Sequence, residues 1–315
     1  MHKAIIALLA VLVSSPPDGS GKVKVFILAG QSNMEGHGFT EGDQKGTLRS
    51  LLKDQASVER YKHLVGKDGK WVARDDVWIV YNDKKGILTV GGYGPKNYIG
   101  PELGFGWGVG DYLKEQVLLL KFAWGGTSLA KDWRPPSSGG TVGDCYTKTI
   151  EGVKGHLKNL KASFPGYDGR ECEIAGFGWH QGWNDGCSAE MTAEYEKNMV
   201  NFIRDVRKEL GVKNLPFVIA NSGFGGWETK NDRRVGIMKA QAAAANHPDF
   251  KGTALCVETR GFFRPVEESP SKQGYHWNGN FETHYLIGEA MGKAMVELLG
   301  GPKAPPNPTG PAGGK

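Results

Sequence analysis

One serine in this sequence lies where a catalytic nucleophile would be expected. It belongs to Gly30-Gln31-Ser32-Asn33-Met34, which follows an apolar run over residues 23–29 that predicts a buried β-strand. Active sites of open α/β sheets lie beyond the carboxyl ends of strands, and a serine on a strand-to-helix turn is a candidate nucleophile there. The N–H groups of a helix that begins after Ser32 could bind a developing negative charge. The alternative is an ordinary N-cap serine, and the rest of the chain decides between the two.

Polar residues follow the other predicted strands and could complete a site for acyl transfer. Attack on an ester carbonyl needs a base that removes the serine proton and donors that bind the oxyanion. A glycine turn, an asparagine and a late histidine suit these tasks. The loops that carry such residues are Trp124-Gly125-Gly126-Thr127-Ser128, Trp179-His180-Gln181-Gly182-Trp183-Asn184-Asp185, Asn221-Ser222-Gly223, Glu258-Thr259-Arg260 and Tyr275-His276-Trp277-Asn278.

Other histidines compete with His276 or suggest a metal site. His284 lies within a helical pattern, which favours packing or a surface position over the role of base. His180 follows a strand and could orient substrate or be a core residue, and His37 could contact substrate. A metal bound by His37, His180, Asp185 and His276 is a weaker alternative, because neither His-x-x-x-His nor Cys-x-x-Cys spacing occurs. We therefore expect no metal and no cofactor.

The chain is also rich in tryptophan near the candidate loops. Tryptophan can stack on the apolar faces of sugar rings, although filling a core is the commoner role. We expect two or more of these residues to line a pocket. The six in question are Trp107, Trp124, Trp133, Trp179, Trp183 and Trp277.

Strand and helix patterns alternate along residues 23–299. This order predicts a mostly parallel, five-stranded sheet in a three-layer α/β/α sandwich. The glycine-rich residues 40–100 are expected to form an insertion, with strand-like stretches at 77–81 and 87–90 as hairpins over one edge of the site. The predicted strands are 23–29, 117–123, 172–177, 216–220 and 253–257, and the predicted helices are 101–114, 146–160, 189–210, 232–246 and 281–299.

Both ends of the chain differ from this pattern. Met-His-Lys followed by the uncharged residues 4–13 is typical of a signal peptide, so we expect residues 1–20 to be cleaved and the protein to be exported to the periplasm or beyond. The apolar run is too short to span a bilayer, and no membrane attachment is expected after cleavage. Residues 21–300 would form one domain, and the Pro/Gly-rich residues 301–315 a disordered tail. The net charge of +5 is scattered, which argues against nucleic acid as a partner.

The ordered set of motifs resembles the SGNH hydrolase superfamily, whose fold is flavodoxin-like, and within it the sialate O-acetylesterase-like branch of the carbohydrate acetylesterases. The resemblance spans residues 23–299. Its blocks are Gly30-Gln31-Ser32-Asn33-Met34, Gly100-Pro101-Glu102, Gly125-Gly126-Thr127 with Trp133, His180-Gln181-Gly182 with Asn184-Asp185, and His276 before a helix that contains Gly288.

The resemblance implies a role for each matching residue. Ser32 would be the nucleophile and His276 the base. Gly125 or Gly126 and the side chain of Asn184 would form the oxyanion hole together with the Ser32 N–H. Residues expected to shape the pocket or bind substrate are Gln31, Gln181, His180, Trp183 and Trp277.

Two positions depart from that branch. Gln273 stands where many relatives have an aspartate three residues before the histidine, and Trp183 stands where many have glutamate. Asp185 and Glu258 are therefore the candidates for the acid that orients His276, although a backbone carbonyl could also serve, and a Ser-His dyad is the working hypothesis. The favoured hypothesis is a secreted serine esterase that removes O-acetyl groups from carbohydrate. The alternative is a catalytically impaired carbohydrate-binding protein on an esterase scaffold, and the sequence does not determine the oligomeric state.

Overall fold

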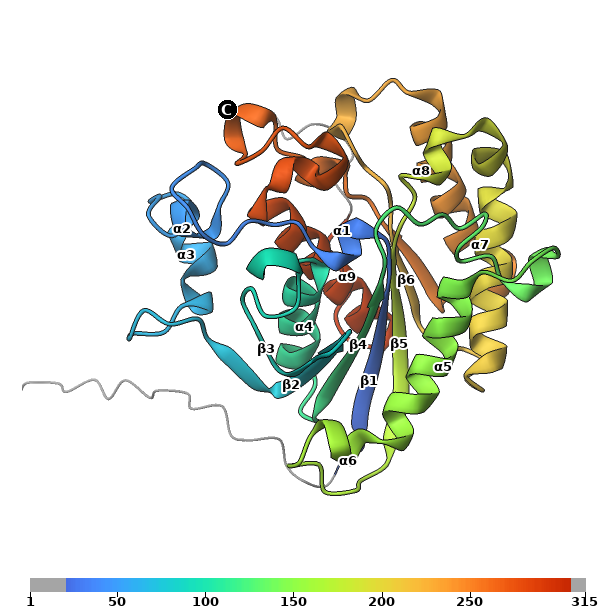
Figure 1. Ribbon diagram of the computed structural model, residues 1–315, viewed down its shortest axis with the longest axis horizontal. Coiled ribbons are helices and arrows are strands. Elements are labelled where there is room, and N and C mark those ends of the chain that lie inside the picture. Colours follow the sequence, from blue (N-terminus) through green and yellow to red (C-terminus); the bar gives the residue numbers. More distant parts are fainter. Residues whose placement is uncertain (1–20, 307–315) are drawn as a thin grey trace, which may run out of the picture.

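A seven-stranded sheet forms the centre of the protein. The computed structural model describes residues 21–306, so the predicted signal peptide lies outside the described residues (Figure 1). The strand order is β3-β2-β4-β1-β5-β6-β7, and β3 alone runs antiparallel to its neighbour. The strands are β1 (Val23–Gly30), β2 (Ala73–Tyr81), β3 (Lys84–Thr89), β4 (Val117–Ala123), β5 (Cys172–His180), β6 (Phe217–Ala220) and β7 (Ala254–Val257).

Helices cover both faces of this sheet, which confirms the predicted three-layer class. Helices α4 (Pro101–Tyr112) and α9 (Phe281–Leu298) bury their apolar side chains on one face. Helices α5 (Asp144–Lys158), α7 (Ala189–Glu209) and α8 (Asp232–Ala245) cover the other (Figure 1). Four short helices complete the set: α1 (Ser32–Glu35), α2 (Leu48–Leu51), α3 (Val58–Tyr61) and α6 (Leu160–Ser163).

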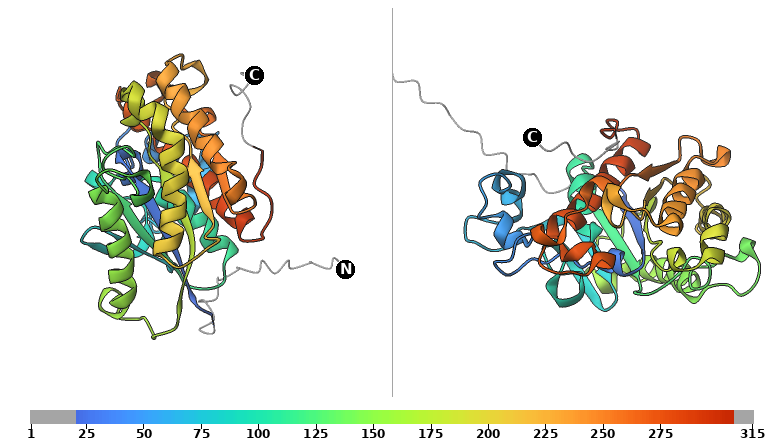
Figure 2. Two further views of the ribbon diagram at one scale, coloured as in Figure 1. Left: turned by 90° about the vertical axis from the view of Figure 1, so that its right-hand side faces the viewer. Right: turned by 90° about the horizontal axis from the view of Figure 1, so that it is seen from above.

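The strand count differs from the prediction because of residues 40–100. β2 and β3 form an antiparallel hairpin, as expected. It does not lie over an edge of the site but joins the sheet, because β2 pairs in parallel with β4, from Val77 opposite Val117 to Tyr81 opposite Lys121. β3 then continues the sheet as its edge. Val77 and Ile79 are fully buried, so burial of this apolar run drives β2 into the sheet. Figure 2 shows the remainder of the segment, α2 and α3, at one side of the molecule, beyond α4 and α9.

Glycines allow α4 and α9 to approach closely. A Cβ atom at Gly288 would lie 2.0 Å from the carbonyl oxygen of Pro101, and one at Gly104 would lie 2.2 Å from that of Tyr285. No side chain fits into these gaps. The contact holds the start of α9, which follows the loop of His276, against the start of α4.

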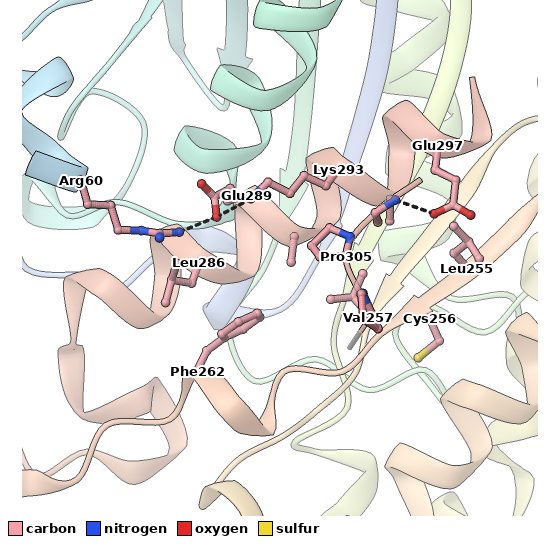
Figure 3. Close-up of a pocket in the computed structure, with 14 residues that line it drawn as sticks. Arg60, Leu255, Cys256, Val257, Phe262, Leu286, Glu289, Lys293, Glu297 and Pro305 are labelled. Atoms are coloured by element: carbon pink, nitrogen blue, oxygen red, sulfur yellow. Dashed lines mark hydrogen bonds and ion pairs between the residues drawn. The ribbon is translucent and has the colours of Figure 1, made fainter. Parts of the chain in front are cut away.

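The first residues after α9 return along that helix. Gly301 N donates to Val296 O at 2.9 Å, and Ala304 N donates to Glu297 Oε2 at 2.9 Å. The last of these residues, Ala304, Pro305 and Pro306, border a cavity of about 340 Å³ between α9 and β7 (Figure 3). Residues 301–306 of the predicted tail thus lie along α9, although most of them are exposed, and residues 307–315 lie outside the described part. Within residues 21–306, no helix is both long and apolar enough to cross a membrane.

Candidate active site

Ser32 begins the single turn of α1, directly after the central strand β1. Gly36 N donates to Ser32 O at 2.9 Å, which closes this turn. Gly30 must be glycine because a Cβ atom there would lie 2.1 Å from the carbonyl oxygen of His180. The Ser32 residue is 8% exposed. The strand, the tight turn and the helix follow one another as the sequence predicted.

Two glutamines hold the surrounding loops together. Gln31 Oε1 accepts hydrogen bonds from the backbone N–H groups of Gly182 and Trp183, both at 3.0 Å. Gln181 Nε2 donates to Thr127 O at 3.0 Å and to Asp185 Oδ2 at 2.6 Å. Both glutamines are 2% exposed. They therefore shape the site as internal braces between loops, through the side-chain oxygen of Gln31 and the side-chain amide of Gln181.

His276 lies in the irregular 3-10 segment η9 (Gly274–Gly279), which packs against the serine turn. Asn33 Nδ2 donates to Tyr275 O at 2.9 Å and ties the two segments together. Nδ1 of His276 lies 3.4 Å from Gln273 Oε1. Because an amide oxygen can only accept, this contact assigns the proton to Nδ1 and leaves Nε2 as an acceptor. Burial lowers the pKa of His276 to about 4, so the ring is neutral at pH 7.

Neither carboxylate that we expected beside His276 is found there. Asp185 is completely buried and accepts hydrogen bonds from the N–H groups of Leu129 and Ala130, both at 2.9 Å, as well as from Gln181. Burial raises the pKa of Asp185 to about 6, against the effect of these donors.

Glu258 is bound to a cation of its own loop. It accepts two hydrogen bonds from the guanidinium of Arg260, at 3.0 and 2.7 Å. Burial acts to raise the pKa of Glu258, but the hydrogen bonds from Arg260 hold that pKa below its ordinary value. Both candidate acids are thus bound elsewhere in the structure: Asp185 links the loop after β4 to its own loop, and Glu258 pairs with Arg260. Gln273 occupies the position of the orienting partner.

The expected oxyanion-hole residues do gather beside Ser32. A Cβ atom at Gly125 would lie 3.7 Å from Cβ of Ser32. The side chain of Asn184 donates to the carbonyl oxygen of Gly126 and so comes to the same loop. At Gly126, with φ of 72°, a Cβ atom would have no atom within 4 Å. This glycine borders open space next to the candidate nucleophile.

Glu35, which the sequence analysis missed, accepts a hydrogen bond from one of the expected oxyanion-hole donors. Glu35 Oε1 accepts the backbone N–H of Gly125 at 3.0 Å. Burial raises the pKa of Glu35, against the opposite effects of the Gly125 amide and of Lys121. The signal was its position three residues after Ser32, which places it on the same helical turn.

Lys121 binds the last residue of α1 from the interior of the protein. Its buried Nζ donates to Glu35 O, Tyr93 O and Glu102 Oε2 at 2.8, 2.7 and 2.8 Å. The Lys121–Glu102 ion pair is inside the protein, with side-chain exposures of 0% and 3%. Since a buried charge requires such partners, this group of contacts fixes the turn that carries Ser32.

Two residues expected to bind substrate are too deeply buried to line an opening. His180 is 1% exposed and Trp277 is 0% exposed. Nδ1 of His180 lies 3.2 Å from Ala220 O, and burial lowers the pKa of this histidine to about 4. Trp277 packs on Phe224, with ring centroids 4.9 Å apart. Both residues belong to the buried core on which the candidate site rests.

Trp183 and Tyr275, which adjoin the loops of Asn184 and His276, form an aromatic pair beside the candidate site. Their ring centroids are 5.8 Å apart, and Tyr275 is 44% exposed. The guanidinium of Arg234 lies 4.0 Å from the centroid of the Trp183 ring. Of the other tryptophans, Trp124 is partly exposed. The buried ones are Trp107, Trp133 and Trp179.

The rings of His37 and His276 lie face to face, with centroids 3.6 Å apart and an angle of 9° between planes. Parallel rings in contact do not aim their nitrogens at a common point. Asp185, the third member of the metal site considered above, is bound by backbone amides instead. Among residues 21–306, no group of three or more histidines, cysteines or acids has the geometry to hold a metal ion.

Solved structures with this fold include one described as a carbohydrate acetylesterase. A protein from Arabidopsis thaliana is 17% identical with a TM-score of 0.58, and the match covers 88% of this chain and 99% of the other. A carbohydrate acetylesterase from Xanthomonas citri is 14% identical with a TM-score of 0.54, covering 87% and 56%. NanS is 13% identical with a TM-score of 0.53, covering 83% and 85%. Such low identities show a shared fold.

The sequence itself is similar to one protein family over most of its length. No curated protein matches it. The model of the family "Carbohydrate esterase, sialic acid-specific acetylesterase" matches residues 22–283, a range that begins just before β1 and contains both Ser32 and His276. Since this range covers most of the chain, the protein belongs to that family of carbohydrate esterases and is a carboxylic ester hydrolase.

Proposed function

We propose that this protein is a serine esterase that removes O-acetyl groups from a carbohydrate, with Ser32 as nucleophile and His276 as base. The observation that carries the proposal is the hydrogen bond of 2.9 Å between Asn33 Nδ2 and Tyr275 O. It joins the residue after the candidate nucleophile to the residue before the candidate base. Membership of the carbohydrate esterase family supports the same chemistry.

In the proposed reaction, Oγ of Ser32 forms a bond to the acetyl carbon while its proton passes to Nε2 of His276. The carbonyl oxygen becomes an oxyanion, for which the N–H groups of Ser32 and Gly126 and the side chain of Asn184 are candidate donors. The Gly125 N–H joins them only if it leaves the Glu35 carboxylate. When the bond from the acetyl carbon to the sugar oxygen breaks, His276 returns the proton to that oxygen. Water then attacks the acetyl-serine, releases acetate and restores Ser32.

The side chains of Trp183, Tyr275 and Arg234 beside the candidate site suggest which kind of sugar is released from the ester. The exposed ring of Tyr275 offers an apolar face on which a sugar can stack. The guanidinium of Arg234, which lies over the ring of Trp183, adds a positive charge beside it. These side chains would favour a sugar that carries a carboxylate, as sialic acids do, and the description of the family names these sugars.

Acetate release by the purified protein tests the proposal. A small aryl acetate, acetylated xylan and an O-acetylated sialic acid would be compared, with and without EDTA. We expect release that EDTA does not change, that Ser32→Ala abolishes, and that Ser163→Ala, in helix α6, retains. Turnover by Ser32→Ala would refute the nucleophile, and loss in EDTA would revive a metal mechanism. Glycan binding without any release would favour the carbohydrate-binding alternative.

We also propose that the protein is exported. The basic start and the uncharged residues 4–13 support this, since they have the layout of a signal peptide. Sequencing of the mature N-terminus after expression of the full chain tests it. A new terminus between residues 15 and 21 is expected, and an intact terminus in the cell extract would contradict export.

A further inference from the structure

The backbone on both sides of His37 is fixed relative to Ser32. Before it, Gly36 N donates to Ser32 O, and a Cβ atom at Gly36 would lie 2.3 Å from Gly100 N. After it, Gly38 and Ile99 exchange two backbone hydrogen bonds, both of 2.9 Å. The His37 ring therefore stands at a set place beside the serine turn.

The ring of His276 has much less to hold it. Its contact with Gln273 Oε1 is 3.4 Å, longer than an ordinary N–H···O hydrogen bond. No other hydrogen bond to this ring occurs within the part of the chain that the structure describes. The backbone that follows is unusual, because Trp277 and Asn278 have φ values of 53° and 55°. Two rings contact it: that of the neighbouring Tyr275 meets it edge-on, with centroids 4.5 Å apart, and the face of His37 lies parallel to it at 3.6 Å. The parallel face of His37 is the contact that sets the plane of the His276 ring.

The ring of His37 is also uncharged at neutral pH. Burial, with smaller effects of His276, Lys121 and Lys96, lowers the pKa of His37 to about 3. Its Nε2 is buried and has no hydrogen-bond partner among the described residues. A cation is attracted to the face of an aromatic ring, so a proton acquired by His276 would lie against a neutral face. The further titratable groups that face these rings are His284 of α9 and, beyond it, His180 of β5.

We infer that His37 is a positioning residue in the reaction proposed above: its ring holds the plane of the His276 imidazole and faces the imidazolium that forms. This inference rests on the proposed function. In this chain the stacked ring takes over part of what an aspartate would do, because the partner of Nδ1 is a neutral amide. His37 itself exchanges no proton with the substrate.

Two substitutions separate the ring face from the imidazole chemistry. His37→Phe keeps a planar ring, whereas His37→Ala removes it and admits water to His276. We expect His37→Ala to lower kcat on an aryl acetate by about 10- to 100-fold, as misplacement of a catalytic group does. The acid limb of the kcat/KM profile should move from near pH 4 towards the ordinary histidine value, because burial is what lowers the pKa of His276. His37→Phe should retain both the rate and the acid limb.

His63→Ala serves as the matched control, since His63 is a part-buried histidine that lies against Tyr285 and Trp107, away from the site. It should leave the rate and the acid limb unchanged. Equal losses in His37→Phe and His37→Ala with an unmoved acid limb would overturn the inference, and so would full activity of His37→Ala. If His37→Ala does not fold, His37→Leu replaces it and tests the aromatic face through the rate. Ser32→Ala and His276→Ala, measured alongside, show separately whether the proposed function itself holds.

Discussion

The candidate base is oriented by an amide, and this shapes its chemistry. Gln273 Oε1 accepts from Nδ1 of His276 at 3.4 Å and so selects the tautomer with a free Nε2. A neutral oxygen stabilises an imidazolium less than a carboxylate would. Together with burial, this leaves His276 neutral over a wide pH range but weakly basic.

Replacing this amide by an acid gives a direct test at the residue scale. Gln273→Asp should raise the pKa of His276, because a nearby negative charge favours the protonated ring. Since the base works only when neutral, the acid limb of kcat/KM should move upward from about pH 4. The plateau at higher pH should rise because the base is stronger. Gln273→Ala is the control, and an acid limb that does not move in Gln273→Asp would show that residue 273 does not face the ring in solution.

The placement of single residues was predictable where a motif and a strand end coincided. Gly125, Gly126 and Asn184 lie beside Ser32, and His276 lies on the segment that is tied to the serine turn. The roles of these residues stay predictions. The acid was not predictable, because buried carboxylates such as Asp185 also serve to bind backbone N–H groups. Distant contacts such as the His37 stack depend on the path of both chain segments, which no local pattern encodes.

At the scale of elements, Asp185 joins the loop after β4 to the loop after β5. Its carboxylate accepts the N–H groups of Leu129 and Ala130 from one loop and the amide of Gln181 from the other. Both loops carry candidate oxyanion-hole residues. Their relative position therefore depends on a carboxylate that never meets the substrate.

Asp185→Asn should destabilise the protein, because its amide NH₂ cannot accept from all three donors. We expect a loss of about 1–3 kcal/mol for an unsatisfied buried donor. The loss should also depend on pH. The pKa of Asp185 is raised to about 6, so its favourable contribution is present below about pH 4 and is lost as the pH rises through 6. The difference from wild type should thus be larger near pH 4 than at pH 7, by up to about 3 kcal/mol.

Urea unfolding at the two pH values would measure this dependence. Asp83→Asn, in the exposed turn between β2 and β3, is the control and should change stability little. A loss for Asp185→Asn that is the same at both pH values would contradict the raised pKa.

Most elements were predictable to within a few residues because apolar periodicity or a continuous apolar run marks them. Helix α5, at Asp144–Lys158, is an example of the first, and strand β4, at Val117–Ala123, of the second. The placement of β2 was not predictable in this way. Its first half, Ala73-Arg74-Asp75-Asp76, is polar, and only pairing with β4 turns the rest into an internal part of the sheet.

For the molecule as a whole, the contact between α4 and α9 fixes the base side of the site to the rest of the fold. Gly288→Ala should weaken this contact, because its Cβ atom would lie 2.0 Å from the backbone oxygen of Pro101 and the helices would have to separate. We expect a destabilisation of about 1–3 kcal/mol or more. Thermal or urea unfolding would measure it.

Gly155→Ala is the matched control for that change. Gly155 lies within α5, is exposed, and would place its Cβ atom in open space. Alanine there should stabilise the protein by about 0.5–1 kcal/mol, since glycine is unfavourable within a helix. An unchanged or raised stability of Gly288→Ala would contradict the close approach of α4 and α9.

The hydrogen bond between Asn33 and Tyr275 joins residues that are 242 positions apart. During synthesis on the ribosome, the serine turn emerges with the first strand, and its partner arrives only after six further strands have been made. An incomplete chain would carry an exposed serine without its base and could not turn over an ester. In the proposed reaction, esterase activity would therefore require a folded chain that includes His276. A protein truncated before residue 275 would have no activity rather than partial activity.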